Sequence, residues 1–181
     1  MYKISDIPKY TSRASWSVNV SWQFLEEHIE SHGDRNYILD FDPDFQRVHV
    51  WTEAQQIRYV EFILRGGNSG KDLYFNCVGW QMDYEGPYVL VDGKQRLEAV
   101  RKFMRNELPV FNSGFLGNKE PLLLKDFSDK PRIMDTYFNW HVNNLKTRKE
   151  VLQWYLDLNA GGIAHTEQEL DKVRKLLELE K

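Results

Sequence analysis

The sequence predicts an α+β fold, in which a small β-sheet packs with helices and a mostly helical part follows at the C-terminus. Up to residue 111, short apolar runs typical of strands alternate with segments whose apolar residues recur at helical spacing. From Lys125 to Lys181 the spacing is mostly helical, with breaks at residues 141–146 and at Ala160-Gly161-Gly162. A chain of 181 residues, 41% hydrophobic and 28% charged, fits a single domain over residues 1–181.

An N-terminal extension, residues 1–22, ends in a strand pattern. Residues Trp16 to Trp22 alternate between apolar and polar side chains, which is typical of a half-buried edge strand that a partner strand or subunit can cover. Ser21 is then expected to cap a helix from Trp22 to Ser31. Gly33-Asp34 ends this helix before a short strand at residues 37–41.

Turn residues separate the next elements. After the turn Asp42-Pro43-Asp44 and residues 45–51, Thr52 and Gln55 have the spacing of a capping box, which predicts a helix to about Arg65. Gly66-Gly67 stops that helix, and the next strand is expected at residues 73–78.

A hairpin-like segment at residues 83–87 precedes a buried strand at residues 88–91 and a helix at residues 94–106. Residues 108–111 are expected to return to the sheet. The last helix has Thr166 and Glu169 at capping-box spacing.

The turn Val91-Asp92-Gly93-Lys94-Gln95-Arg96-Leu97 is the most informative stretch. Lys94 and Arg96 fall in the first helical turn, where the partial positive charge of the helix N-terminus disfavours cations unless an anion lies among them. A bound phosphate would be such an anion, and Gly93 lets the backbone approach it closely. The alternative is a capping box, in which Asp92 and Gln95 satisfy the helix N–H groups and the basic side chains face water.

Composition limits the classes of function. A net charge of −3 and a pI near 6.0 give no overall electrostatic case for wrapping a nucleic-acid backbone, although a local basic groove stays open. The single cysteine, Cys77, excludes an internal disulfide, suits a reducing compartment and is expected in the core. The sequence shows no signal peptide and no membrane span, so we expect a cytoplasmic protein.

Three separated patches resemble the DUF262 family, whose members carry a DGQQR motif and have a fold related to ParB and sulfiredoxin. They are Pro43-Asp44-Phe45-Gln46-Arg47 with Trp51, the 91–97 turn, and Leu158-Asn159-Ala160-Gly161-Gly162 with Thr166 and Glu169-Leu170. They span residues 36–170 in the family's order. The sequence departs from the commonest motif at Lys94, where Gln is usual, and it ends before the additional nuclease domain that members in restriction systems often carry.

The resemblance implies a ParB/sulfiredoxin-like module with a small mixed β-sheet, similar to the N-terminal module of GmrSD-type modification-dependent restriction proteins. Several proteins with this motif use nucleotide hydrolysis or sensing to control an attack on modified foreign DNA. The family's motif turn contacts nucleotide phosphates, which suggests three groups of phosphate ligands here. They are Gly93, Lys94, Gln95 and Arg96 in the turn, Arg47 in the first patch and Asn159 in the third.

Asp92 and Gln46 are the expected catalytic residues. Asp92 would orient a water or hold Mg²⁺ between phosphates, and Gln46 would position a water or contact a base. Structural roles stay open for three of these residues: a helix cap for Asp92, a stack on Trp51 for Arg47 and a helix C-cap for Asn159.

Three functions compete. The first is a nucleotide-binding enzyme or switch, either an Mg²⁺-dependent NTPase acting on a nucleoside triphosphate or a nucleotide sensor in restriction, phage defence or counter-defence. The second is a ParB-like protein that binds or nicks DNA, alone or with a separate nuclease subunit; the acidic net charge argues against autonomous cleavage. The third is a non-catalytic interaction module that forms a homo-oligomer through its N-terminal segment.

Two histidine patterns carry less weight. His28 and His32 have a spacing compatible with metal binding on a helix, but no third ligand is evident, so both are expected on the surface. His141 with Asn143 and Asn144 is similar to a nuclease His-Asn pair, but no pattern of metal ligands accompanies it.

Overall fold

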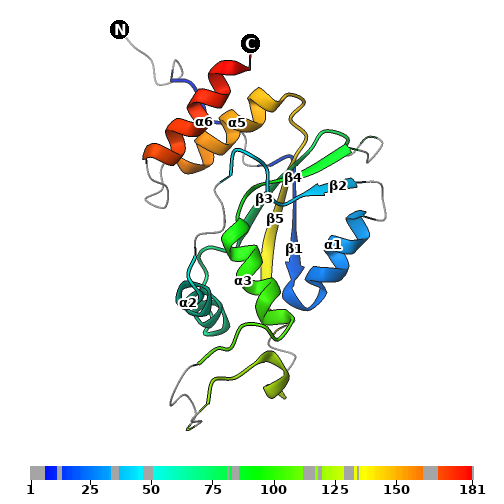
Figure 1. Ribbon diagram of the computed structural model, residues 1–181. Helices are drawn as coiled ribbons and strands as arrows, with labels where there is room; N and C mark the ends of the chain where they lie inside the picture. The colour runs from blue at the N-terminus through cyan, green and yellow to red at the C-terminus, as the bar shows by residue number, and fades with distance from the viewer. Residues whose placement is uncertain are drawn as a thin grey trace.

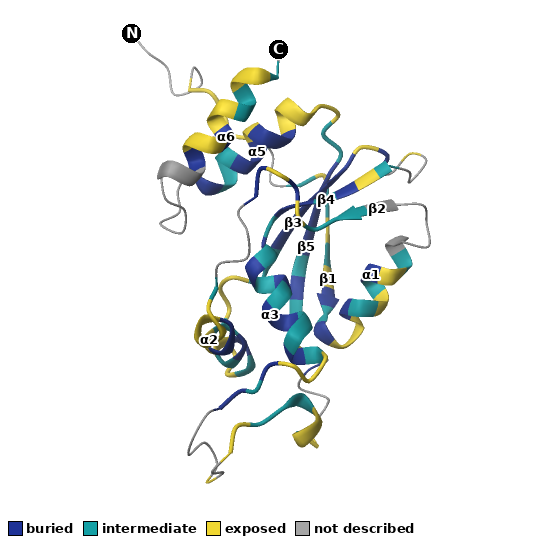
Figure 2. Ribbon diagram, in the orientation of Figure 1, coloured by how far each residue is buried: buried dark blue, intermediate teal, exposed yellow. Residues whose placement is uncertain are grey.

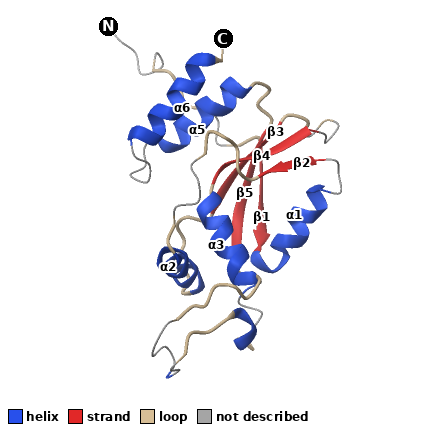
Figure 3. Cartoon of the chain, viewed as in Figure 1, coloured by secondary structure: helices blue, strands red, loops and turns tan. Residues whose placement is uncertain are grey.

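One mixed β-sheet with helices on both of its faces forms the centre of the computed structural model (Figure 1, Figure 3). The structure describes residues 7–11, 14–33, 37–46, 51–80, 86–111, 120–128, 135–160 and 167–180, and the single positions 82, 117 and 133.

Five strands form the sheet in the order β1-β5-β3-β4-β2. The β1–β5 and β3–β4 pairs are antiparallel, whereas the β5–β3 and β4–β2 pairs are parallel. This arrangement confirms the α+β class and the small mixed sheet. The strands are β1 Trp16–Ser21, β2 Tyr37–Asp40, β3 Asp72–Cys77, β4 Gly86–Asp92 and β5 Tyr137–Asn143.

Helices cover the sheet in two groups. Figure 1 shows α1 and α3 lying along the sheet with α2 beside α3, while α5 and α6 pack together beyond one end of the strands. The helices are α1 Leu25–Gly33, α2 Glu53–Leu64, α3 Lys94–Met104, α5 Arg148–Asn159 and α6 Glu167–Leu179, with short 3₁₀ turns η2 Trp22–Phe24 and η4 Leu124–Asp126.

The two sheet faces have different chemistry. On the face that packs against α1 and α3, Phe75 stacks on Trp140 with ring centroids 4.0 Å apart, and the indole N–H of Trp140 donates to the hydroxyl of Tyr88. On the opposite face, Tyr74 and Val91 join Trp154 of α5 in a smaller apolar cluster. Figure 2 shows the buried residues concentrated along the central strands and the inner sides of the helices.

Several predicted local features are confirmed. The hydroxyl of Ser21 accepts a hydrogen bond from the Gln23 backbone, and both bonds of the Thr52–Gln55 capping box are present. Cys77 is fully buried in the core. No helix among the described residues is long and apolar enough to cross a membrane. Thr166 and the side chain of Glu169 lie outside the described residues, so the predicted cap of the last helix stays a prediction.

Two predicted elements are wrong. The predicted helical break at residues 141–146 begins inside a strand, because β5 runs through His141 to Asn143 and cross-strand hydrogen bonds satisfy its polar side chains. Residues 108–111 do not join the five-stranded sheet, since Val110 makes only an isolated bridge to Leu122. Phe111 has a positive φ of 57°, which is incompatible with an extended strand.

Candidate functional site

The β4–α3 turn leaves the start of α3 without a side-chain cap. Gly93 occupies the N-cap position in the left-handed region, at φ 109°, and the N-cap makes no side-chain hydrogen bond. A Cβ at Gly93 would lie 2.4 Å from Leu73 Cδ2, so close packing on β3 also demands glycine. The alternative in which Asp92 caps α3 is therefore wrong.

Asp92 pairs with Arg96 instead. One guanidinium nitrogen of Arg96 donates to Asp92 Oδ2 at 2.8 Å and to the backbone carbonyl of Asp72 at 3.0 Å. Burial by itself lowers the pKa of Arg96, but the charge and hydrogen bond of Asp92 outweigh it and raise that pKa, so the guanidinium stays charged. Its Nε is buried and has no hydrogen-bond partner among the described residues.

Lys94 has a different kind of partner. Its ammonium forms an ion pair with Asp42, which lies in the turn after β2. The side chain of Asp42 is 74% exposed, whereas that of Lys94 is only 17% exposed. Both cations at the start of α3 are thus balanced by carboxylates of the chain itself, one half-buried and one on the surface.

Two buried glutamines attach the first family patch to this turn. The side-chain amide of Gln46 donates to the carbonyl of Leu90 in β4, and the side-chain oxygen of Gln95 accepts the backbone N–H of Trp51 at 2.9 Å. The structure thereby confirms that the segment after Asp44 lies beside the turn. Arg47 is outside the described residues, so both its phosphate role and its stack on Trp51 stay predictions.

Tyr59 and the 66–71 loop form a wall beside Arg96. The phenol of Tyr59 donates to the carbonyl of Gly70 at 2.7 Å, and a Cβ at Gly70 would lie 3.7 Å from Arg96 Cδ. Burial is the main cause that raises the pKa of Tyr59, so its hydroxyl stays protonated as a donor. Arg96 is thus bonded to Asp92 and to the carbonyl of Asp72, and it lies beside Gly70.

A polar row that was not predicted from the sequence crosses three strands. Strand register aligns Ser17, His141 and Tyr74 on one face of the sheet, and Asp92 lies opposite Tyr74 at a register shift between β3 and β4. The His141 ring bonds Ser17 Oγ at 2.7 Å and Asp72 Oδ1 at 2.8 Å, and it stacks on Tyr74. Because the carbonyl of Asp72 binds Arg96, this row positions the guanidinium. The alternation of Phe138, Trp140 and Val142 with Asn139, His141 and Asn143 indicates a strand, but only its register in the sheet decides which side chains meet.

Asn159 is the last residue of α5. Its buried side-chain amide donates to the carbonyl of Tyr155, one turn back, and the C-cap position itself is Ala160. Tyr155 packs on Phe45 next to the first patch, with ring centroids 5.6 Å apart. The third patch therefore lies on the same side of the sheet as the first.

The first patch thus lies against the β4–α3 turn, and α5, at whose end the third patch begins, packs on the first patch. A family model described as the GmrSD restriction endonuclease N-terminal domain matches residues 25–175. The chain belongs to this family. Searches of curated proteins and of solved structures gave no match. The GmrSD match includes Gln46, the turn and Asn159, whereas β1 and the residues before it lie outside.

The arrangement of His, Cys, Asp and Glu side chains bears on metal binding by this GmrSD-type domain. The described residues contain no group of three or more His, Cys, Asp or Glu side chains arranged to hold a metal ion. The prediction that His28 lies on the surface is wrong, because it is half-buried and packs edge-on against Trp140 with ring centroids 4.8 Å apart. The side chain of His32 is outside the described residues.

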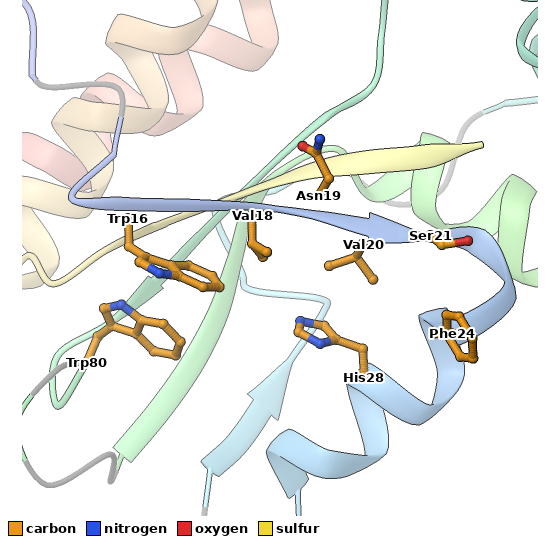
Figure 4. Close-up of a pocket in the computed structure, with 8 residues that line it drawn as sticks. All are labelled: Trp16, Val18, Asn19, Val20, Ser21, Phe24, His28 and Trp80. Atoms are coloured by element: carbon orange, nitrogen blue, oxygen red, sulfur yellow. The ribbon is translucent and has the colours of Figure 1, made fainter. Parts of the chain in front are cut away.

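A groove of about 490 Å³ follows β1 on the sheet face opposite the polar row. Figure 4 shows Trp16, Val18 and Val20 pointing into it, His28 and Phe24 reaching it from α1 and the preceding turn, and Asn19 pointing to the other side of the strand. Trp16 packs on Trp80 with ring centroids 4.9 Å apart. This groove is apolar and is separate from the turn.

Proposed function

We propose that this GmrSD-type domain binds a nucleotide and that the N-terminus of α3 holds its phosphates. The observation that carries the proposal is a helix start with a left-handed glycine, no side-chain cap and two cations in its first turn. Backbone N–H groups at such an end are free to bind phosphate oxygens, and the helix dipole favours the negative charge. Lys94 adds a point charge and Arg96 a planar pair of donors.

The carboxylates of Asp92 and Asp42 have different roles. Asp92 is half-buried and fixes Arg96, so it stays in place when a ligand binds. Asp42 is on the surface, where an ion pair contributes little, so a phosphate can replace it at Lys94. Asp42 is thus a substitute anion that balances Lys94 while the site is free of ligand.

We further propose that the bound nucleotide is hydrolysed with the help of Mg²⁺. Mg²⁺ is commonly bound by one or two carboxylates together with substrate phosphates, so Asp92 suits it only when phosphates supply further oxygens. When bound, the ion would neutralise charge on the phosphates. We retain the predicted catalytic role of Gln46. Its side-chain amide donates to the carbonyl of Leu90, so this hydrogen bond must break before the amide can position a water.

Thermal unfolding tests binding. Each of the four nucleoside triphosphates, added with Mg²⁺, is screened for a rise in Tm, because a ligand that binds only the folded state stabilises it. Lys94→Ala should remove the rise, and Lys102→Ala, in the last turn of the same helix, should keep it. No response to any of the four would contradict the proposal. Release of inorganic phosphate then separates hydrolysis from sensing.

Because the family is described as the N-terminal domain of a restriction endonuclease, we propose that the nucleotide state of this domain is read by a nuclease domain or a separate nuclease subunit. The alternative is that the domain itself binds or nicks DNA. Plasmid DNA, unmodified or glucosylated, incubated with the protein and Mg²⁺ or Mn²⁺ distinguishes the two: nicks made by this chain alone would favour the alternative.

Self-association is a second candidate function. Among the described strands, β1 lies at an edge of the sheet. Proteins commonly protect edge strands from pairing with charged residues or proline, and β1 contains neither. Its alternation is symmetric about Val18, so a second copy can pair antiparallel and extend the apolar groove in Figure 4. Light scattering should show a dimer that Phe24→Lys dissociates and Phe62→Lys, an equally exposed site on α2, does not.

A further inference from the structure

A small cavity lies between the N-terminal segment, β3 and the last turns of α5. It has a volume of about 260 Å³ and is lined by Tyr10, Thr11, Tyr74, Trp154, Asp157 and Leu158. The backbone N–H of Thr11 donates to Asp157 Oδ2 at 2.8 Å, which fastens the N-terminal segment over α5. Tyr10 and Thr11 lie outside the residues that the family model matches.

Three aromatic rings and two polar groups define the chemistry of the cavity. Tyr10 is 70% exposed, whereas Tyr74 and Trp154 are buried and meet edge to face. The indole N–H of Trp154 is buried without a hydrogen-bond partner among the described residues, a costly state for a donor. Asp157 accepts from Thr11 and from Gln153, and a carboxylate can accept further N–H groups.

The cavity also lies close to the proposed phosphate site. Tyr74, which forms its floor, is paired in strand register with Asp92, the residue immediately before the α3 turn. Trp154 and Val91 share one apolar cluster, so α5 packs directly on the end of β4. A ligand with its phosphates at the turn can therefore extend one end into the cavity.

We propose that this cavity binds the base of the nucleotide, with Tyr10 stacking on its face and Asp157 accepting its N–H donors. The inference rests on the proposed function. Guanine matches the polar groups best, because it presents two adjacent N–H donors beside a carbonyl oxygen. Stacking on an aromatic side chain contributes to binding for any base, so Tyr10 sets affinity and Asp157 sets preference.

Calorimetric titration of the whole chain with GTP and with inorganic tripolyphosphate, each with Mg²⁺, tests this assignment. GTP should bind wild type more tightly than tripolyphosphate, and Tyr10→Ala should weaken GTP binding about tenfold without changing tripolyphosphate binding. Tyr10→Phe should retain GTP affinity because it retains the ring. Phe62→Ala, at an exposed ring on α2, is the matched control and should change neither.

The outcomes separate the two proposals. If GTP and tripolyphosphate bind wild type equally, or if Tyr10→Ala weakens both alike, the cavity does not hold the base, while the phosphate site stands. If neither ligand binds, the proposed function fails and the base site fails with it. A selective loss of GTP affinity in Tyr10→Ala, retained in Tyr10→Phe, supports the base site.

Discussion

The starts of α2 and α5 differ from the start of α3. Thr52 with Gln55 and Thr147 with Glu150 form complete capping boxes, and Glu53 and Glu150 lie in the first turns of these two helices. α3 has a glycine in place of a capping side chain and no acidic residue in its first turn. Side chains of the chain itself therefore stabilise the starts of α2 and α5, whereas the positive end of α3 can be stabilised by a bound anion.

Replacing Gly93 at the start of α3 should have the largest effect on stability. Gly93→Ala should lower the free energy of unfolding by roughly 3 kcal/mol, because the added methyl group meets Leu73 and the left-handed backbone strains alanine. Gly66→Ala is the control: its φ is also positive, at 89°, but a Cβ there meets nothing within 4 Å, so it should cost only about 1 kcal/mol. Denaturant unfolding measures both losses. Equal losses would show that glycine is needed at position 93 only for its positive φ and not for close packing on Leu73.

Removing a true cap sharpens the contrast. Thr52→Ala should cost about 1 kcal/mol of stability, as expected for a lost N-cap hydrogen bond, and it should not alter nucleotide binding. Urea unfolding together with a nucleotide titration measures both quantities. A Thr52→Ala variant that loses nucleotide affinity would mean that α2 takes part in the site.

The surface carboxylate beside Lys94 gives a smaller effect. Asp42→Asn should leave stability within about 0.5 kcal/mol, since an exposed ion pair contributes little. It should tighten binding of tripolyphosphate severalfold, because the phosphate no longer competes with a carboxylate for Lys94. Calorimetry measures the change, and weaker binding by Asp42→Asn would show that Asp42 assists the ligand, for example through Mg²⁺.

The smallest expected effect is on the pH dependence of stability. It applies to the Thr147–Glu150 capping box, which contains a carboxyl group, and not to the Thr52–Gln55 box. Hydrogen bonds from the Thr147 backbone and hydroxyl hold the pKa of Glu150 below its ordinary value of 4.5. A carboxyl with a lowered folded-state pKa stabilises the protein above its unfolded-state value, and this contribution is lost as pH falls below 4.5. Glu150→Gln should therefore make stability slightly less sensitive to acid. Unchanged acid sensitivity of the unfolding midpoint would contradict it.

Local sequence patterns predicted the elements whose determinants are local. The Thr52–Gln55 spacing gave the first residue of α2, and the alternation in residues 16–22 gave β1. The cations at 94 and 96 indicated an unusual helix start, but local spacing could not decide between a cap and an ion pair for Asp92. That choice depends on where β3 places the carbonyl of Asp72 and the side chain of Leu73.

The missed features depend on long-range register. Asn139, His141 and Asn143 alternate with apolar residues, and the local sequence does not say which side chains these three polar residues meet. In the sheet, Asn139 and His141 bond the side chain of Asp72, His141 also bonds Ser17, and Asn143 lies opposite Asn76. Asp42 as the partner of Lys94 is likewise separated from it by 52 positions.

We propose that, of the helix starts of α2, α3 and α5, only that of α3 binds an anion. Amide resonances of the ¹⁵N-labelled protein, recorded during titration with magnesium tripolyphosphate, test it directly. The resonances of Lys94 and Gln95 should shift with saturating dependence on ligand, while those of Glu53 and Ala54 at the start of α2 stay in place. Equal shifts at both helix starts, or none at Lys94 and Gln95, would contradict the account.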